Sequence, residues 1–403
     1  MIRVLFWAAT ALIGYTYLAF PAVVALRARL AARPHAQADI TPRVSVIIGA
    51  HDEEASIDGR VANLLAQDYP ADRLEIVVAS DGSTDGTVAA ARRDDPRVIV
   101  LDLPRVGKAA ALNAAVERSG GEILVFSDAN TAYAVNAIRV LVRSFADPEV
   151  GGVAGDQVYL PAAVPGDPGA ELVDAVGVGE GSYWNLERRM KRYESLAGNV
   201  ISATGAIYAL RRELFRTVPD GVTDDFITST AVIAQDRRLV FEPRALAFEP
   251  VAGSSRSEYR RKVRIMTRGL RGVVLARALL DPRRHGFYAV QLLTHKILRR
   301  LMAVPLLLIA ATSPLLWSHG PLYRLAAIGQ VAVYGLGLLG TGLRGHRLGR
   351  HRLLAFPAFF CLVNVASLHA LFNLATGRRI ARWEPGRGPA AGPDDPDGTG
   401  RAG

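Results

Sequence analysis

The sequence predicts an α/β domain built on a mainly parallel β-sheet, joined to an α-helical transmembrane bundle. One pattern occurs three times between residues 41 and 280: a short β-branched run, a carboxylate, small polar residues and then a helical pattern. Near-continuous apolar strands that alternate with helices are typical of a parallel sheet covered on both faces. The bundle is predicted by one long apolar run at the N-terminus and three more before the C-terminus.

Each of the three predicted strands ends in acids. Their sequences are "RVSVIIGAHDEEASI", "LEIVVASDGSTDGT" and "EILVFSDANT". In such sheets a ligand binds beyond the carboxyl ends of the strands, so these acids should gather along one rim. Helix capping is the alternative, because Asp, Ser and Thr are favoured caps at strand-to-helix turns. A cap does not need an acid at the tip of successive strands, however, so we favour ligand binding for Asp81 and Asp128.

The chemistry of the rim indicates a diphosphate bridged by a divalent cation. No G-x-G-x-x-G follows the first strand, and Gly107-Lys108 lacks the remaining residues of a P-loop. Acids at strand ends, with a lysine and arginines elsewhere in the domain, suit a phosphate ligand and a hard cation such as Mg²⁺ or Mn²⁺.

Residues 1–26 are predicted to form a transmembrane helix, because a bilayer core of about 30 Å requires roughly 20 apolar residues. A cleaved signal peptide is the alternative, but its apolar core would be shorter. Residues 297–375 contain the three further apolar stretches, Ile297–Trp317, Leu325–Leu343 and Leu353–Leu374. Residues 283–300 are predicted to form an interfacial helix. Its headgroup side would carry His295, Lys296, Arg299 and Arg300.

The formal net charge of +10 does not indicate nucleic-acid binding, because the arginines cluster beside the apolar segments. The positive-inside tendency places the domain over residues 41–280 in the cytoplasm of a multi-pass cell-membrane protein. Four spans would leave an arginine-containing tail outside, unless a C-terminal segment is re-entrant or interfacial. Residues 384–403 are Pro/Gly/Asp-rich and are predicted to be a disordered tail. A single cysteine, Cys361, excludes a disulfide framework.

Seven motifs in order resemble the family 2 glycosyltransferases, in particular the membrane-embedded branch of cellulose, hyaluronan and poly-N-acetylglucosamine synthases. The resemblance covers about residues 41–271 and the flanking membrane segments. It is carried by "VSVIIGAHDEEASI", "VVASDGSTDGT", "GKAAALNAA", "SDANT", "ATGAIYALRREL", "TDDF" and "RRKVR". It implies a GT-A-type nucleotide-sugar-binding domain.

The resemblance also implies a role for each motif. The first strand holds the nucleotide base through backbone and acids, Asp81 contacts the uracil or ribose, and "TDDF" supplies the catalytic base. "SDANT" falls on the metal and diphosphate motif Asp-x-Asp. The substrate-binding residues implied are Ala50, Asp52, Glu53, Asp81, Lys108, Asp128, Gly205 and Arg261, and the metal ligands are Asp128 and Asn130.

Two positions depart from the family pattern. Asn130 replaces the second acid of Asp-x-Asp; its amide oxygen can ligate a cation but carries no charge. In the Gln-x-x-Arg-Trp motif, Arg261 and Ile265 stand in for Gln and Trp. This motif lies at the acceptor site of the polymerising enzymes, so the lost Trp argues against processive chain synthesis.

The reaction needs a base for the acceptor proton and positive charge at the departing diphosphate. We expect Asp225 to be the base, with Asp224 raising its proton affinity by like-charge repulsion. An N-cap role for Asp225 is the alternative. Arg264 is expected to hold the diphosphate with help from Arg261, whereas Arg268 and Arg271 are expected to rest on anionic lipid.

These observations predict a membrane-bound inverting glycosyltransferase that moves a sugar from a nucleotide sugar, in particular a UDP-sugar, to a glycan hydroxyl. A polyprenyl-phosphate or other lipid acceptor is the rival within enzymes. An inactive nucleotide-sugar-binding assembly partner is the rival of another class. The expected ligands and surroundings are the donor, the acceptor, Mg²⁺ or Mn²⁺ and the lipid bilayer; no motif identifies a partner subunit.

Overall fold

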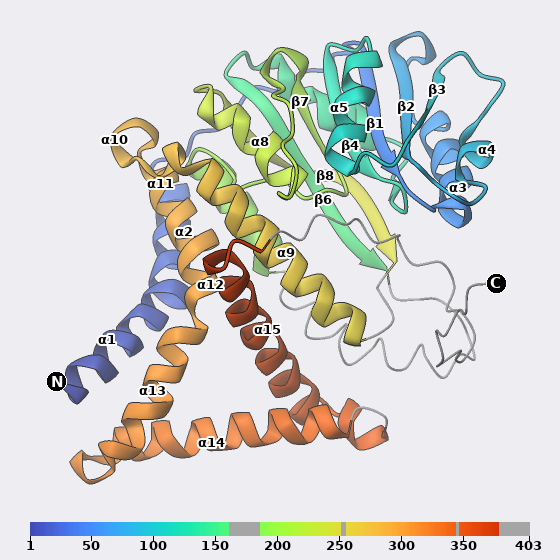
Figure 1. The fold of residues 1–403 in the computed structure, drawn as a ribbon. Helices are drawn as coiled ribbons and strands as arrows, with labels where there is room; N and C mark the ends of the chain where they lie inside the picture. Colours follow the sequence, from blue (N-terminus) through green and yellow to red (C-terminus); the bar gives the residue numbers. More distant parts are fainter. Residues whose placement is uncertain (161–185, 251–254, 344–345, 379–403) are drawn as a thin grey trace, which may run out of the picture.

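The computed structural model describes the chain except for residues 161–185, 251–254, 344–345 and 379–403. Figure 1 shows a sheet domain and, below it in that view, a set of long helices. The segment expected to form a disordered tail, residues 384–403, lies outside the described residues. The candidate site belongs to the sheet domain, at the side that faces the long helices.

Among the described residues, eight strands form one sheet at the centre of the domain, in the order β3-β2-β1-β4-β7-β6-β8-β5. Its strands are β1 Val44–Ala50, β2 Leu74–Asp81, β3 Val98–Leu103, β4 Ile123–Asp128, β5 Ala132–Tyr133, β6 Val150–Leu160, β7 Tyr208–Arg211 and β8 Arg238–Pro250. β5 and β7 run antiparallel to their neighbours, whereas all the other pairs are parallel. The predicted mainly parallel sheet is therefore confirmed.

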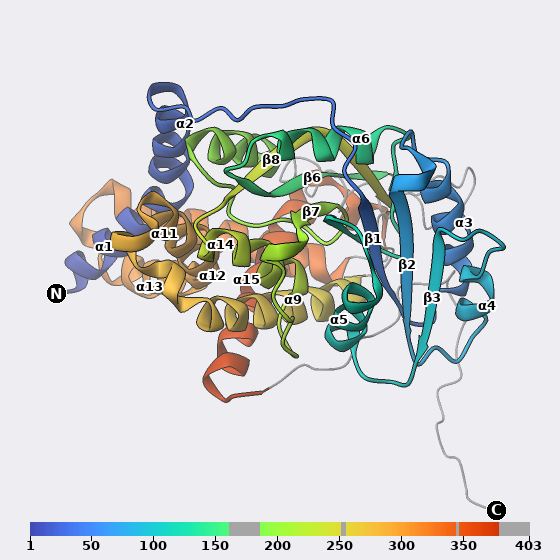
Figure 2. The ribbon, with the colours of Figure 1, turned by 90° about the horizontal axis from the view of Figure 1, so that it is seen from above.

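Helices cover both faces of this sheet, which explains why the central strands are apolar on both sides. All residues of β1 are buried. One apolar core includes side chains of α3 (Glu54–Leu65), α4 (Thr87–Ala91) and α6 (Ala137–Val142). The opposite core includes α5 (Lys108–Arg118) and α8 (Asp224–Ala234). Figure 2 shows α5 and α6 on opposite sides of the sheet.

The strand register aligns the tips of three neighbouring parallel strands. Ala50 at the end of β1 pairs with Ser80 on β2, and Gly49 pairs with Asp128 on β4. Asp81 follows Ser80 directly, so the carboxyl ends of β2, β1 and β4 meet at one edge. This edge is the rim predicted from the three strands that end in acids.

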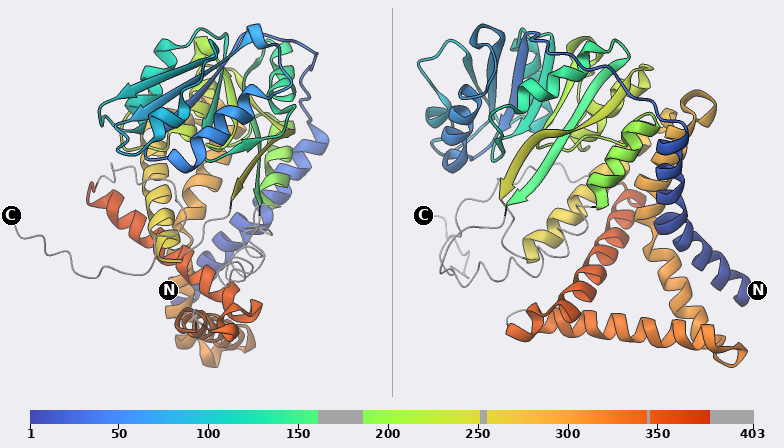
Figure 3. Two further views of the ribbon diagram at one scale, coloured as in Figure 1. Left: turned by 90° about the vertical axis from the view of Figure 1, so that its right-hand side faces the viewer. Right: turned by 180° about the vertical axis from the view of Figure 1, so that it is seen from behind.

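In the part of the chain that the structure describes, three helices are long and apolar enough to cross a membrane: Ile2–Leu30, Pro321–Gly342 and Arg352–Ala375. The first consists of α1 (Ile2–Gly14), a π-helical turn and α2 (Phe20–Leu30), and the others are α14 and α15. The bent pair Phe287–Leu301 and Ala303–Leu315, with an angle of 49°, would make a fourth span if it crosses as one unit. In Figures 1 and 3, α13 (Ala303–Leu315), α14 and α15 form three sides of a triangle.

Two glycines let α14 lie close against α15. A Cβ at Gly337 would come within 2.6 Å of Cys361 Sγ, and one at Gly340 within 2.4 Å of the Leu354 carbonyl oxygen. Small residues at helix interfaces are typical of transmembrane packing, because backbones can approach closely there. Large apolar side chains elsewhere on α14, among them Leu325 and Val331, are exposed, as expected of a lipid-facing helix.

The segment predicted as an interfacial helix is helical but broken. It comprises α10 (Pro282–His285), a turn at Gly286 with a φ of 54°, α11 (Phe287–Leu292), a π-helical stretch Leu293–Leu298 and α12 (Arg299–Leu301). The expectation that His295 faces lipid headgroups is wrong. His295 is buried, with Nε2 3.0 Å from Glu187 Oε1 and Nδ1 3.1 Å from Glu194 Oε1. These two acids lie on the helix over residues 186–197 and tie it to the segment.

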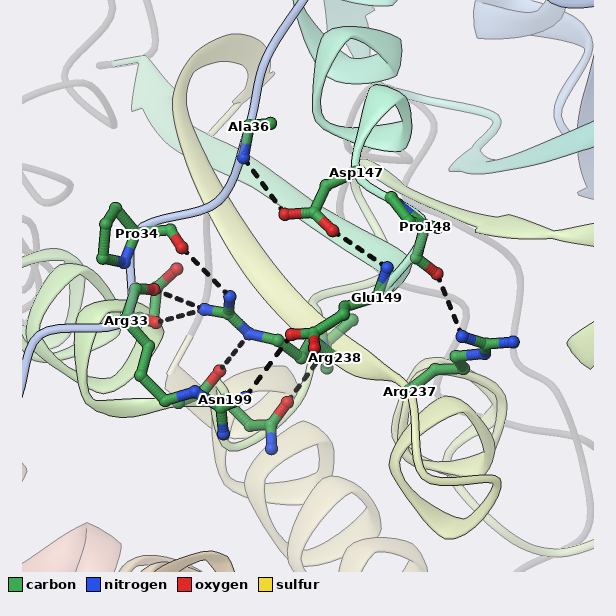
Figure 4. A network of polar contacts seen from close by, with 12 residues as sticks. Arg33, Pro34, Ala36, Asp147, Pro148, Glu149, Asn199, Arg237 and Arg238 are labelled. Carbon is green, nitrogen blue, oxygen red and sulfur yellow. Dashed lines mark hydrogen bonds and ion pairs between the residues drawn. The ribbon is translucent and has the colours of Figure 1, made fainter.

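The linker after α2 is fixed to the sheet domain by the buried Arg238 (Figure 4). Its guanidinium donates to the carbonyl oxygens of Arg33 and Pro34 at 2.6 and 3.3 Å, and to that of Gly198 at 3.2 Å. The Ala36 amide donates to Asp147 Oδ2 at 3.1 Å. Carbonyl groups of a non-helical linker need such donors when they leave water. The N-terminal helix is thereby held in a defined place beside the domain.

Candidate active site

Asp81 anchors the loop that leads into α5. Its side chain is fully buried, and Oδ1 accepts hydrogen bonds of 2.7 Å from the backbone N–H groups of both Val106 and Gly107. Its Oδ2 accepts no hydrogen bond from the described residues and lies 3.9 Å from Arg105 Nε. Asp81 therefore positions the residue that follows the loop, Lys108. A direct contact with the nucleotide stays a prediction.

Lys108 joins two carboxylates that come from distant segments. Its Nζ lies 2.9 Å from Asp128 Oδ1, at the tip of β4, and 3.2 Å from Asp224 Oδ2, in the first turn of α8. Burial alone lowers the pKa of an ammonium, but the two carboxylates outweigh it and raise the pKa of Lys108. Lys108 is thus a fixed positive charge in the centre of the site.

Asp225 lies beside Asp224 in the first turn of α8, and its pKa is raised. Burial raises the pKa of Asp225 to about 6, with a further contribution from Asp224, while Lys296 and Lys108 act in the opposite direction. Its Oδ1 accepts a 2.7 Å hydrogen bond from the Phe226 amide. The position before the helix is Thr223, so Asp225 is not the N-cap of α8. A carboxylate with a pKa near 6 is ionised at neutral pH and still basic enough to take a proton.

Tyr208 lies beneath the acids and was not predicted from the sequence as a site residue. It is fully buried on β7, stacked on Phe126 with ring centroids 4.9 Å apart. Burial, followed by the charges of Asp224, Asp225 and Asp128, raises the pKa of Tyr208. Because all three acids act on one ring, they converge above β7. The sequence did contain a signal for this residue, because Tyr208 lies in "ATGAIYALRREL", one of the seven motifs that carry the family resemblance.

Helix α9 (Ser255–Leu275) brings arginines to the acids from the side of the long helices. Arg264 has a buried nitrogen, Nη1, with no hydrogen-bond partner among the described residues. The expectation that Arg268 faces lipid is wrong, because its Nε is buried and the charges of Asp224 and Arg264 both act on its guanidinium. Arg268 therefore belongs to the site as well. Both guanidiniums could hold phosphate oxygens.

Hydrogen bonds join the loop that follows β1 to the loop that follows β2. Asp52, with a φ of 51°, accepts a 2.7 Å hydrogen bond from the Thr84 amide through Oδ1. The Glu53 amide donates to Thr87 Oγ1 at 2.7 Å, and Glu53 Oε2 accepts from Ser56 Oγ at 2.7 Å. Ala50 is the last residue of β1 and lies directly before the first of these loops. Contacts of Ala50, Asp52 and Glu53 with a nucleotide base stay predictions.

The donor groups around Asp128 fit a hard cation that is shared with a diphosphate. Asp128 offers carboxylate oxygens and Asn130 an amide oxygen, which are ligand types that Mg²⁺ and Mn²⁺ accept. A Cβ on Gly205 would come within 2.9 Å of Asp128 Oδ2, so only glycine leaves this carboxylate in place. No group of three or more acidic, His or Cys side chains that could hold a metal ion occurs in the described part of the chain. A cation here would therefore take its other ligands from the donor phosphates and water.

The mainly parallel sheet with helices on both faces is a GT-A-like α/β domain, and the acids with a central lysine lie at the carboxyl ends of its strands. The model of the family described as "Glycosyl transferase family 2" matches residues 45–218. An N-acetylglucosaminyltransferase of Bradyrhizobium elkanii is 34% identical over 125 residues, which cover 30% of this chain and 68% of that protein. The chain therefore belongs to glycosyl transferase family 2.

Other relatives match a longer part of the chain. An N-acetylglucosaminyltransferase of Rhizobium meliloti (strain 1021) is 28% identical over 258 residues, 59% of this chain and 58% of that protein. A poly-beta-1,6-N-acetyl-D-glucosamine synthase of Staphylococcus epidermidis is 23% identical over 231 residues, 55% of this chain and 53% of that protein. The chain thus spans little more than half the length of these relatives.

A solved structure extends the similarity to the helices outside the sheet domain. The mannosyltransferase PcManGT from Pyrobaculum calidifontis, in complex with GDP-Man and Mn²⁺, matches with a TM-score of 0.67 and 25% identity. The match covers 93% of this chain and 100% of that chain. A GT-A-like sheet domain combined with long apolar helices is therefore an arrangement that a known glycosyltransferase shares.

Proposed function

We propose that this protein is an inverting, membrane-bound glycosyltransferase that moves a sugar from a nucleoside-diphosphate sugar to an acceptor hydroxyl. The acceptor oxygen forms a bond to the anomeric carbon as the bond between that carbon and the diphosphate oxygen breaks. Asp225 takes the acceptor proton, and the nucleoside diphosphate leaves. The observation that carries this proposal is the convergence of Asp128, Asp224 and Asp225 around Lys108 and Tyr208.

Each charged group has a role that follows from its surroundings. Asp224 keeps Asp225 basic by repulsion and pairs with Lys108. Arg264, with an unpartnered buried N–H among the described residues, would receive the diphosphate, where negative charge grows as the bond breaks. Arg261 would assist from one turn earlier on the same helix. Mg²⁺ or Mn²⁺ held by Asp128 and Asn130 would neutralise part of that charge.

We favour a UDP-sugar as donor and a glycan as acceptor, because the curated relatives include a poly-beta-1,6-N-acetyl-D-glucosamine synthase. A lipid acceptor is the second candidate. It is favoured by Ile265, which stands where the polymerising enzymes carry Trp, and by the position of α9 between the sheet and α15. The mannosyltransferase with the similar fold was solved with GDP-Man, so GDP-sugars belong among the donors to be tested.

We further propose a membrane topology. Residues 1–26 would anchor the chain, residues 41–280 would form the cytoplasmic catalytic domain, and residues 283–300 would lie at the interface. Residues 297–375 would supply the C-terminal spans. Supporting this proposal are the three apolar helices of sufficient length and the arginines that flank them on the domain side. The side of the bilayer on which the C-terminus lies depends on whether the bent helix pair crosses as a fourth span.

A donor screen tests the proposed activity. The full chain, purified in detergent, would be given UDP-sugars and GDP-mannose with Mg²⁺ or Mn²⁺, with and without membrane lipid extract, and assayed for nucleoside diphosphate release. We expect release from one donor class and its loss with a chelator. Product that partitions into organic solvent would identify a lipid acceptor, and long chains a glycan acceptor. No release from any donor would contradict the proposal and favour an inactive nucleotide-sugar-binding partner.

A further inference from the structure

Glu249 reaches the cation motif from a different part of the sheet. The short strand β5 pairs antiparallel with β8, with Ala132 opposite Phe248 and Tyr133 opposite Ala247. The next step in this register places Glu249 beside Thr131, which directly follows Asn130. Glu249 is therefore brought to the turn that carries the departure from Asp-x-Asp, although it lies more than a hundred residues later in the chain.

The contacts of Glu249 hold its carboxylate in the site. Gln157 Nε2 donates a short hydrogen bond to Glu249 Oε2, and Gln157 itself lies on β6, the parallel neighbour of β8. Burial raises the pKa of Glu249 to about 7, and the charge of Asp128 adds to this effect. Gln157, Arg261 and a hydrogen bond with the Asn130 side chain act in the opposite direction. Asp128, Asn130 and Arg261 all lie close enough to act on this one carboxyl group.

Asn130 needs such a neighbour more than an aspartate would. An amide has one oxygen and one nitrogen, so only one of its two orientations presents an acceptor to a cation. A carboxylate that accepts from the amide nitrogen selects that orientation. A cation nearby favours the ionised form of a carboxyl group, so with the cation in place Glu249 also returns to the site the negative charge that is missing when asparagine replaces aspartate. Groups that orient metal ligands in this way commonly change metal affinity by 10- to 100-fold when they are removed.

We propose that Glu249 is a positioning residue of the cation site: it orients the Asn130 amide and supplies, from β8, the negative charge that Asn130 lacks. This inference rests on the proposed function, because the cation is the one that accompanies the donor diphosphate. The roles of Asn130 and Glu249 are then coupled. An aspartate at position 130 should replace Glu249, and the two acids together should repel each other.

A double-mutant cycle tests this coupling without requiring turnover. Mn²⁺ binding to the full chain in detergent would be measured from the electron paramagnetic resonance signal of free Mn²⁺, alone and with UDP or GDP. The variants are Glu249→Gln, Asn130→Asp and both together. Glu242→Gln is the matched control, because Glu242 is a buried acid on the same strand that pairs with Arg244 instead. Thermal melting of each variant would show that it is folded.

We expect Glu249→Gln to weaken Mn²⁺ binding in the presence of nucleotide by about 10- to 100-fold. The double variant should regain most of this loss, and Glu242→Gln should bind as the wild type does. Unchanged Mn²⁺ affinity of Glu249→Gln would overturn the inference. So would an effect of Asn130→Asp that is the same with and without Glu249. Because binding is the readout, failure here is distinct from failure of the proposed transfer, which the donor screen would reveal.

Discussion

Lys108 Nζ lies 3.2 Å from Asp224 Oδ2, and this ion pair links the start of α5 to the first turn of α8. The same ammonium is 2.9 Å from Asp128, so one cation compensates two acids that the fold brings together from β4 and α8. Asp81 holds the loop from which Lys108 projects. A chain of polar contacts thus runs from the tip of β2 to the proposed base.

Replacement of Lys108 by methionine should therefore disturb both acids. We expect Lys108→Met to lower the free energy of unfolding by about 1–3 kcal/mol, because two partly buried carboxylates lose their partner. Transfer should fall by about 100-fold, since fixed charge at the diphosphate is lost. Arg118→Met is the control, because Arg118 is exposed in the last turn of the same helix. Calorimetry and initial rates check both expectations, and a fully active Lys108→Met would refute the bridging role.

The pH dependence should report the base. The pKa of Asp225 is raised to about 6, and only its ionised form accepts a proton, so activity should fall as the pH drops through about 6. Asp224→Asn removes the like charge that contributes to this shift, so its acid limb should move to lower pH even if its rate is reduced. Rate–pH profiles of kcat/KM check both. If the acid limb of Asp224→Asn lay at the same pH as that of the wild type, Asp224 would not be raising the pKa of Asp225.

Asp81 offers a choice between a structural and a ligand-binding role. Asp81→Ala removes the acceptor of two backbone N–H groups, and hydrogen bonds to a charged group contribute about 1.5–3 kcal/mol each. Asp81→Asn keeps an acceptor oxygen at the same place and should be much closer to wild type in stability. Thermal melting and UDP binding separate the two roles. Weak UDP binding by a fully stable Asp81→Asn would show that the carboxylate serves the nucleotide rather than the loop.

A side chain at Gly205 should shift the Asp128 carboxylate. A Cβ there would meet Asp128 Oδ2 at 2.9 Å, so Gly205→Ala must displace the carboxylate. We expect it to weaken Mn²⁺ binding by about 10-fold or more, as displaced metal ligands commonly do. Gly59→Ala is the matched control, since nothing lies within 4 Å of its Cβ position on α3 and alanine favours helices by about 1 kcal/mol. Equal Mn²⁺ affinities of the two variants would refute the close approach.

The rim of the sheet could be predicted because its signals are local. A β-branched run that ends in an acid identifies β1, β2 and β4, and their common direction then aligns Ala50, Asp81 and Asp128. The pair Asp224 and Asp225 likewise forms a local pattern at a helix start. These predictions need only strand polarity and the favoured chemistry of each turn.

The remaining site residues depend on contacts between distant segments. Tyr208 enters because β7 inserts antiparallel between β4 and β6, and Glu249 because β5 returns to pair with β8. Arg268 faces the acids because α9 packs between the sheet domain and α15. The basic helical pattern of α9 alone does not show which side of the helix faces the sheet domain. A signal for Glu249 was present, since "ALAFEP" also ends an apolar run in an acid.

The central proposal is that Asp225 is the base that takes the acceptor proton. Wild type, Asp225→Asn and Asp236→Asn would be compared for nucleoside diphosphate release and sugar transfer with the donor found in the screen. Asp236 lies just beyond the far end of α8 with a φ of 57°, a conformation that asparagine adopts readily. The control variant should therefore fold as the wild type does, and it loses the same negative charge as Asp225→Asn. We predict that Asp225→Asn loses transfer by at least about 100-fold while Asp236→Asn retains it. Equal rates for the two variants would contradict the assignment of the base.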